Sequence, residues 1–71
     1  MEISPEMMTV IQRIKDIRTE KGLSQFELAS RIGKNASSIG RLEIGKVNPS
    51  LRYLIDIAKG LEVDISEFFK K

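Results

Sequence analysis

Residues 24–44, which read SQFELASRIGKNASSIGRLEI, decide the fold. Ser24 and Glu27 have the spacing of a capping box, in which two side chains bind otherwise unpaired backbone amides at the start of a helix. Ala29 is small enough for a second helix to cross closely, and four residues later Gly33 can adopt the positive φ angle that reverses the chain. This stretch therefore predicts two short helices joined by a tight turn, a helix-turn-helix.

Capping residues and apolar periodicity extend the prediction to five helices, with no competing strand pattern. We expect helices from Ser4-Pro5 to Gly22, from Ser24 to Gly33, from Asn35 to Gly45, from Asn48-Pro49 to Leu61, and, after a capping box of Asp64 and Glu67, through Phe68-Phe69. The connections between them are two to five residues long, which favours one compact globule. The sequence therefore predicts an all-α fold in which residues 1–71 form a single domain.

The composition restricts the classes of protein and site. A domain of 71 residues has a thin core and usually needs disulfides, a metal or a partner subunit for additional stability. The sequence contains neither cysteine nor histidine, which excludes disulfides, thiolate metal sites and the usual catalytic bases and nucleophiles. We therefore expect no enzyme, no cofactor and no metal site, and we expect self-association to supply the missing stability.

The distribution of apolar residues indicates where the protein is located. No apolar run approaches the roughly 20 residues that span a bilayer, and the N-terminus lacks the basic region and apolar stretch of a secretory signal. We therefore expect a cytoplasmic protein. Because the sequence starts with Met1 and ends with two lysines, we also expect a whole gene product without a separate effector domain.

Charge is unevenly distributed along the chain, although the formal net charge is only +2. Residues 31–52 carry five basic side chains and one acid, whereas residues 56–67 carry four acids and one base. One end of the molecule can therefore attract a polyanion that the other end repels. The alternative is that both segments are ordinary solvated surface.

A longer pattern of residues continues past the second short helix. It reads Ser24-Gln25-x-Glu27-Leu28-Ala29-x-x-Ile32-Gly33, then Ile39-x-x-Leu42-Glu43-x-Gly45-Lys46, then Asn48-Pro49-Ser50-Leu51. This pattern resembles the phage repressor/Cro helix-turn-helix family, the Xre-like regulators, from about residue 11 to residue 69. Residues 60–69 are similar to compact members such as restriction–modification controller proteins and some antitoxins. The resemblance implies a five-helix, lambda-repressor-like DNA-binding domain whose third helix enters the major groove.

The resemblance also implies which residues contact DNA. Gln25 matches a position that binds a phosphate, with an exposed polar residue as the alternative. Arg41 is the one long donor on the third helix and is suited to guanine, with a phosphate contact as the alternative. Lys46 matches a phosphate-contacting loop. The complete expected set is Ser24, Gln25, Lys34, Asn35, Ala36, Ser37, Ser38, Gly40, Arg41, Lys46, Asn48 and Arg52.

The third-helix surface departs from that of some family members. Ala36 and Ser37 stand where those members carry paired glutamines, so we expect modest direct base readout and a larger share from DNA shape. Gly40 costs about 1 kcal/mol relative to alanine inside a helix. Two reasons for that glycine stay open: close approach of the backbone to DNA, or packing within the protein.

Two charged residues of this region are expected to have a structural role instead. In the resembled family, the positions of Arg18 and Glu43 form a partly buried salt bridge that joins the first helix to the third. We therefore expect Arg18 and Glu43 to pair with each other, so that neither contacts DNA directly.

The apolar residues of the C-terminal segment predict a dimer interface. Val63, Ile65, Phe68 and Phe69 exceed what one short helix can bury, although Phe68 also fits the intramolecular core. An isologous homodimer at this surface would place two third helices on one face of the DNA.

These features together predict a transcriptional regulator that binds a pseudo-palindromic operator in double-stranded DNA as a homodimer, either a restriction–modification controller or a prophage-type repressor. The alternative is an antitoxin-type subunit that binds a protein partner as well as DNA. The basic residues Arg31, Lys34, Arg41 and Lys46 argue against a helix-turn-helix that only docks another protein. The sequence leaves open whether RNA polymerase or a toxin is a further partner.

Overall fold

The computed structural model describes residues 2–70, which form four α-helices and one 3-10 helix. The elements are α1 (Pro5–Glu20), α2 (Gln25–Arg31), α3 (Ala36–Glu43), α4 (Leu51–Leu61) and the 3-10 helix η1 (Ile65–Phe69). The all-α fold agrees with the sequence prediction, and the described part of the chain contains no strand. The expected fifth α-helix is instead the short 3-10 turn η1.

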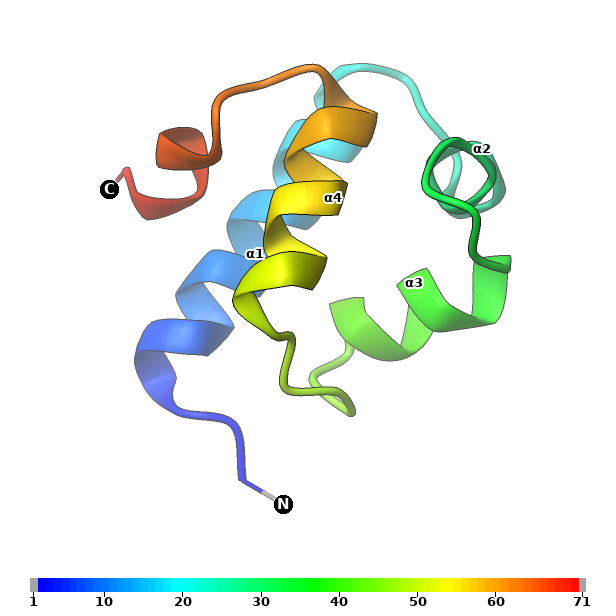
Figure 1. Ribbon diagram of the computed structural model, residues 1–71. Coiled ribbons are helices and arrows are strands. Elements are labelled where there is room, and N and C mark those ends of the chain that lie inside the picture. Colours follow the sequence, from blue (N-terminus) through cyan, green and yellow to red (C-terminus); the bar gives the residue numbers. More distant parts are fainter. Residues whose placement is uncertain (1, 71) are drawn as a thin grey trace.

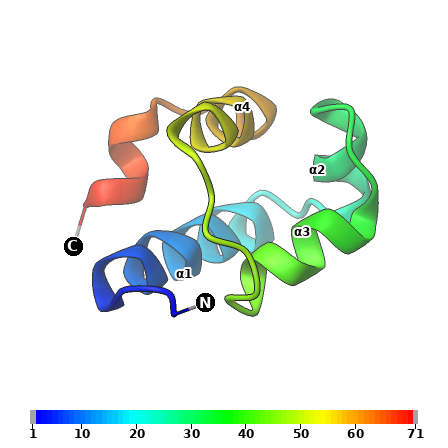
Figure 2. The same cartoon turned by 60° about the horizontal axis from the view of Figure 1, so that its bottom comes forward.

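α1 and α4 form the centre of the molecule (Figure 1). α2 and α3 lie on one side of this pair and η1 lies on the opposite side, an arrangement that is also visible after rotation (Figure 2). Every element contributes to one hydrophobic core, in which Ile14, Leu28, Ile39, Ile57 and Phe68 are fully buried. No helix within residues 2–70 is long and apolar enough to span a membrane.

Three helix starts are formed by the expected capping residues. Ser4 Oγ accepts a hydrogen bond from the Met7 amide at 3.1 Å, with Pro5 as the first helical residue. Ser24 and Glu27 form the complete capping box of α2. Asn35 caps α3. Each of these side chains binds a backbone amide that the helix itself leaves unpaired.

The expected start of the fourth helix at Asn48-Pro49 is wrong. Ser50 is the N-cap of α4, and its hydroxyl accepts a hydrogen bond from the Tyr53 amide at 3.1 Å. Pro49 is buried in the preceding loop. Because Ser50 is also a favourable N-cap residue, the burial of Pro49 moves the helix start two residues along the chain.

The expected capping box of Asp64 and Glu67 is also wrong. The Asp64 carboxylate accepts a hydrogen bond from the Ser66 amide at 2.9 Å, whereas the Glu67 amide donates to the Asp64 carbonyl at 3.0 Å. This tighter turn is the 3-10 pattern. The Glu67 carboxylate instead lies 3.6 Å from the guanidinium of Arg13, which fastens η1 to α1.

The turn between α2 and α3 has the geometry that the sequence predicts. Gly33 has a φ of 72°, and the next amide, that of Lys34, donates back to the Ala29 carbonyl at 2.8 Å. The side chain of Ala29 is fully buried where the two helices meet. The structure therefore contains a helix-turn-helix whose second helix is α3.

Candidate nucleic-acid interface

α3 is amphipathic, and its two faces are clearly separated. Ile39, Leu42 and Glu43 are buried against the core. Ser37 and Arg41 lie on the opposite side, and both are exposed. Because residues four apart on a helix are neighbours on its surface, Ser37 and Arg41 form the centre of the outer face of α3. That face is open to a large ligand.

The N-terminus of α3 is organised around the side chain of Asn35. Its Oδ1 accepts hydrogen bonds from the Ser38 amide at 3.0 Å, the Ser38 hydroxyl at 3.1 Å and the Ser37 hydroxyl at 2.6 Å. Three of the expected DNA-binding residues therefore act as one connected group. These bonds fix the orientation of both serine side chains relative to the helix axis.

A buried ion pair supports α3 from beneath. Arg18 Nε donates to Glu43 Oε2 at 2.7 Å, and Arg18 Nη2 donates to Glu43 Oε1 at 3.0 Å. The Arg18 side chain is 10% exposed and that of Glu43 is 2% exposed. Arg18 Nη1 also donates to the Leu23 carbonyl at 2.6 Å. Arg18 thus connects three parts of the molecule, which are α1, the loop that precedes α2, and α3. This is the structural role that the family resemblance implies.

Gln25 is connected to this ion pair. Its Nε2 donates to Glu43 Oε1 at 3.0 Å. An amide nitrogen carries two hydrogens, so one donor remains for a further acceptor. This geometry is compatible with the predicted phosphate contact of Gln25, which stays a prediction. The hydrogen bond from Gln25 to Glu43 was not expected from the sequence.

Gly40 faces Gln25 across the same part of the structure. A Cβ atom added at Gly40 would lie 3.4 Å from Gln25 Oε1, which is ordinary van der Waals contact. Packing within the protein therefore leaves room for a methyl group at this position. Packing therefore does not explain the glycine, and close approach of the backbone to DNA remains as the reason for Gly40.

A hollow of about 370 Å³ lies between α3 and the start of α4. Its lining residues are Lys34, Ser38, Arg41, Val47, Asn48, Pro49, Ser50 and Tyr53. Four of them belong to the expected DNA-binding set, so the fold brings together residues that are separated by up to 14 positions in the sequence. The structure thus joins the turn, the outer side of α3 and the following loop into one surface.

Tyr53 is the residue of this hollow that sequence reasoning missed. The Lys34 ammonium lies 5.2 Å from the centroid of its ring, a cation–π distance. The Tyr53 hydroxyl is buried without a hydrogen-bond partner in the described structure. Burial raises the pKa of Tyr53, and the nearby positive charge of Arg41 partly opposes this shift. No signal in the sequence marks this position, because the expected start of the helix at Asn48-Pro49 lies two residues before the observed N-cap Ser50.

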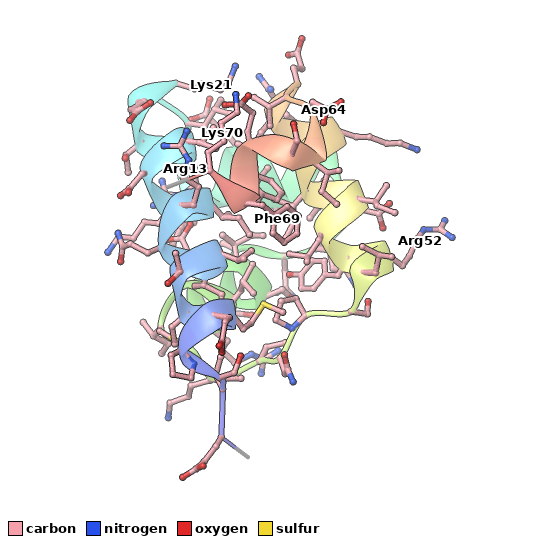
Figure 3. The ribbon with its side chains drawn as sticks, turned by 90° about the vertical axis from the view of Figure 1, so that its left-hand side faces the viewer. Arg13, Lys21, Arg52, Asp64, Phe69 and Lys70 are labelled. Carbon is pink, nitrogen blue, oxygen red and sulfur yellow. The ribbon has the colours of Figure 1, made fainter. Side chains whose placement is uncertain are left out.

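The basic residues of the region divide into paired and unpaired side chains. Arg31, expected to contribute to the basic surface, instead donates to the Gly60 carbonyl at 2.9 Å and lies 3.4 Å from the Glu62 carboxylate. Arg52 points away from the body of the molecule (Figure 3) and pairs with Asp56 at 3.5 Å. Within residues 2–70, Lys34, Arg41 and Lys46 form no ion pair. The same is true of Lys15, Lys21 and Lys59 on other elements, so three of the described cations without an ion pair lie on or beside α3.

The four residues of the expected dimer interface have different environments. Phe68 is fully buried in the core, so its side chain offers no surface to a partner and its assignment to the interface is wrong. The reason is that η1 packs against α1 and α4, and the ring of Phe68 becomes part of the hydrophobic core. Val63 and Ile65 are partly buried against the core. Phe69 is 58% exposed and lies on the face formed by α1, η1 and α4 (Figure 3).

Comparison with known proteins identifies the family. A helix-turn-helix family model matches residues 14–68. An uncharacterized HTH-type transcriptional regulator of Archaeoglobus fulgidus is 40% identical over 57 residues, which cover 80% of this chain and 81% of that protein. Both matches include α2, α3 and the turn between them.

Two solved structures have the same fold. The restriction-modification controller protein C.AhdI from Aeromonas hydrophila has a TM-score of 0.85 and 35% identity, covering 93% of this chain and 100% of that chain. The restriction-modification controller protein C.Esp1396I, in a tetramer with its natural 35 base-pair operator, has a TM-score of 0.83 and 33% identity, covering 96% of this chain and 100% of that chain. The chain therefore belongs to the helix-turn-helix family that its sequence resembles, the family of the Xre-like regulators.

Proposed function

We propose that this protein is a transcriptional regulator that binds double-stranded operator DNA, with α3 in the major groove. The observation that carries the proposal is the exposed outer face of α3, centred on Ser37 and Arg41. Lys34 precedes this helix and Lys46 follows it, and neither forms an ion pair with any residue from 2 to 70. An α-helix fits the major groove, and arginine is the commonest specific partner of guanine there. Cations beside the helix would bind the phosphates on either side of the groove.

The relatives support operator binding more than the antitoxin alternative. C.Esp1396I has been solved as a tetramer on its natural operator, and it shares this fold over nearly the whole chain. The other relatives described above are a transcriptional regulator and a second controller protein. The comparisons therefore give the antitoxin alternative no support. A role as a restriction–modification controller is part of the proposal.

The proposal includes a homodimer. Phe69 provides exposed apolar surface on the face of α1, η1 and α4, and Val63 and Ile65, close to it in the sequence, are only partly buried. A two-fold dimer uses the same patch on both copies, so a small apolar patch is doubled at the interface. Two copies of α3 would then contact half-sites about one helical turn apart.

Fluorescence anisotropy with a labelled random duplex at two salt concentrations tests the proposal. We expect binding that weakens steeply as salt rises, because each phosphate contact releases a counterion and adds about 0.9 to the slope of log K against log salt. Lys46→Ala should reduce that slope by about one for each bound copy. Lys59→Ala, at the far end of α4, is the control and should leave the slope unchanged. Absence of salt-sensitive binding by the wild-type protein would refute DNA binding.

A further inference from the structure

The hydroxyl hydrogen of Ser37 is already used within the protein. The Ser37 hydroxyl lies 2.6 Å from Asn35 Oδ1, the shortest of the three bonds to that atom. An amide oxygen accepts only, so the serine must be the donor. The same oxygen caps α3 through the Ser38 amide, which orients the Asn35 amide group and keeps its oxygen towards the serines.

A serine hydroxyl has one hydrogen and two lone pairs. With its hydrogen bound to Asn35, the exposed oxygen of Ser37 can only accept a hydrogen bond from a ligand. Phosphate oxygens accept only, and in the major groove guanine and thymine also present acceptors. The groups that can donate to Ser37 there are the exocyclic amino groups, N4 of cytosine and N6 of adenine.

We propose that Ser37 is a specificity-determining residue that selects cytosine or adenine on the strand it faces, with Asn35 as the positioning residue that holds its hydroxyl hydrogen. The inference rests on the proposed function and identifies which bases the outer face of α3 reads. Without Asn35, the hydroxyl would be free to donate or accept, and it would discriminate poorly among the four bases.

Neighbouring side chains assign this role to Ser37. The Ser38 hydroxyl also donates to Asn35 Oδ1, but Ser38 is half-buried and lines the hollow beside α4, whereas Ser37 is exposed. Arg41, four residues after Ser37, carries donors only and is therefore complementary to guanine acceptors. The outer face of α3 thus presents an acceptor next to a donor, and an amino-bearing base should lie close to a guanine in the preferred site.

Selection of bound duplexes from a random pool provides the first test. We expect wild-type protein to enrich one position in each half-site for cytosine or adenine, and Ser37→Ala to lose that preference. Asn35→Gly should also lose it while keeping Ser37, because it releases the hydroxyl hydrogen, and glycine is tolerated at a helix N-cap. Identical selected sites for wild-type protein and Ser37→Ala would overturn the inference.

Base analogues provide the second test, because they remove only the amino group. The preferred cytosine of one half-site is replaced by 2-pyrimidinone, or the preferred adenine by purine. Wild-type affinity should fall about tenfold more than that of Ser37→Ala, because the wild-type oxygen is left without a donor. Weaker base pairing by the analogue affects both proteins equally. Equal losses would overturn the inference while leaving DNA binding intact, whereas loss of all salt-sensitive binding by the wild-type protein would refute the proposed function itself.

Discussion

Arginine residues have two different roles in this molecule, and burial separates them. Arg18 is 10% exposed and forms two hydrogen bonds with Glu43, whose side chain is 2% exposed. Arg41 is exposed and forms no ion pair within residues 2–70. A buried pair must remain intact because an unpartnered buried charge is costly, whereas an exposed arginine without a partner remains available to a ligand.

Arg18→Ala should therefore destabilise the fold. Removal of one partner leaves the Glu43 carboxylate buried and uncompensated, which costs about 3–5 kcal/mol. Arg52→Ala is the matched control, because Arg52 forms an exposed pair with Asp56 that contributes at most about 1 kcal/mol. Urea unfolding followed by circular dichroism measures both variants. Equal unfolding midpoints for the two would show that the buried pair has no special structural role.

At the scale of the helices, the two interior glycines have different surroundings. A Cβ atom at Gly60 of α4 would lie 2.7 Å from Ile32 Cγ2 and 3.1 Å from Leu28 Cδ1, so the close approach of α4 to α2 requires a glycine. A Cβ atom at Gly40 of α3 would make only ordinary contact with Gln25. One glycine is needed for packing, and the other is not.

Gly60→Ala and Gly40→Ala should consequently have opposite effects on stability. Gly60→Ala overpacks the contact with α2 and should cost about 1–3 kcal/mol. Gly40→Ala improves helix propensity and should gain up to about 1 kcal/mol. If the backbone of α3 approaches DNA closely at Gly40, the more stable Gly40→Ala variant binds DNA less tightly. Thermal unfolding measures stability, and a Gly40→Ala variant less stable than wild type would contradict this account of its packing.

The capping box of α2 makes stability depend on pH. The hydrogen bond from the Ser24 amide lowers the pKa of Glu27 below its usual 4.5, and the Ser24 side chain lowers it further. A carboxyl whose pKa is lowered by folding stabilises the protein when the pH is above its pKa in the unfolded chain. This stabilisation is lost as the pH falls through the lower pKa of the folded state. Glu27 should therefore stabilise the protein at neutral pH and not at strongly acidic pH.

Glu27→Gln provides the test, because glutamine keeps an oxygen that can bind the Ser24 amide but has no titratable charge. The difference in urea midpoint between wild type and Glu27→Gln should be constant from neutral pH to roughly pH 5 and should shrink towards pH 3. A difference that persists unchanged at acidic pH would mean that the charge of Glu27 is not involved.

At the scale of the whole molecule, the apolar surface around Phe69 lies on the opposite side of α1 and α4 from the helix-turn-helix (Figures 1 and 3). Phe69 is 58% exposed and Phe26 of α2 is 69% exposed. The two rings are chemically identical and similarly accessible, which makes them a matched pair. If the proposed dimer forms, only the ring on the α1–η1–α4 face should be protected by the partner.

Phe69→Ser should accordingly shift the protein towards monomer, whereas Phe26→Ser should leave its association unchanged. The proposed dimer would bury one Phe69 ring from each copy, so the substitution removes much of the apolar area of a small interface. Sedimentation velocity at tens of micromolar measures the change. A wild-type protein that is monomeric at this concentration would refute the dimer, and a dimer insensitive to Phe69→Ser would place the interface elsewhere.

The sequence predicted the features that depend on neighbouring residues. The caps at Ser4, Ser24 and Asn35 and the turn at Gly33 are local, and residue spacing identified them. The same kind of spacing at residues 64–67 was misleading, because η1 is a tighter 3-10 turn. The start of α4 depends on burial of Pro49, and the pairing of Arg31 with the Gly60 carbonyl joins residues 29 positions apart. Such long-range contacts follow from packing, which a single sequence does not encode in any short pattern.

The candidate site was predictable to the same extent. The outer face of α3 followed from the buried positions of Ile39 and Leu42. The contribution of Tyr53, and the sharing of Asn35 Oδ1 by Ser37 and Ser38, required three-dimensional geometry. Residue types and helical spacing therefore identified the surface, and only the structure showed which hydrogen-bonding groups on it are still free.

The central claim is that the outer face of α3 binds DNA, and titration of ¹⁵N-labelled protein with a short duplex tests it directly. In NMR spectra at low salt, the amides of residues 35–41 should shift or broaden most, with smaller effects in the turn at Lys34 and the loop at Lys46. These changes should disappear at high salt. Unchanged amides throughout residues 35–41, with shifts confined to α1 and η1, would contradict the account.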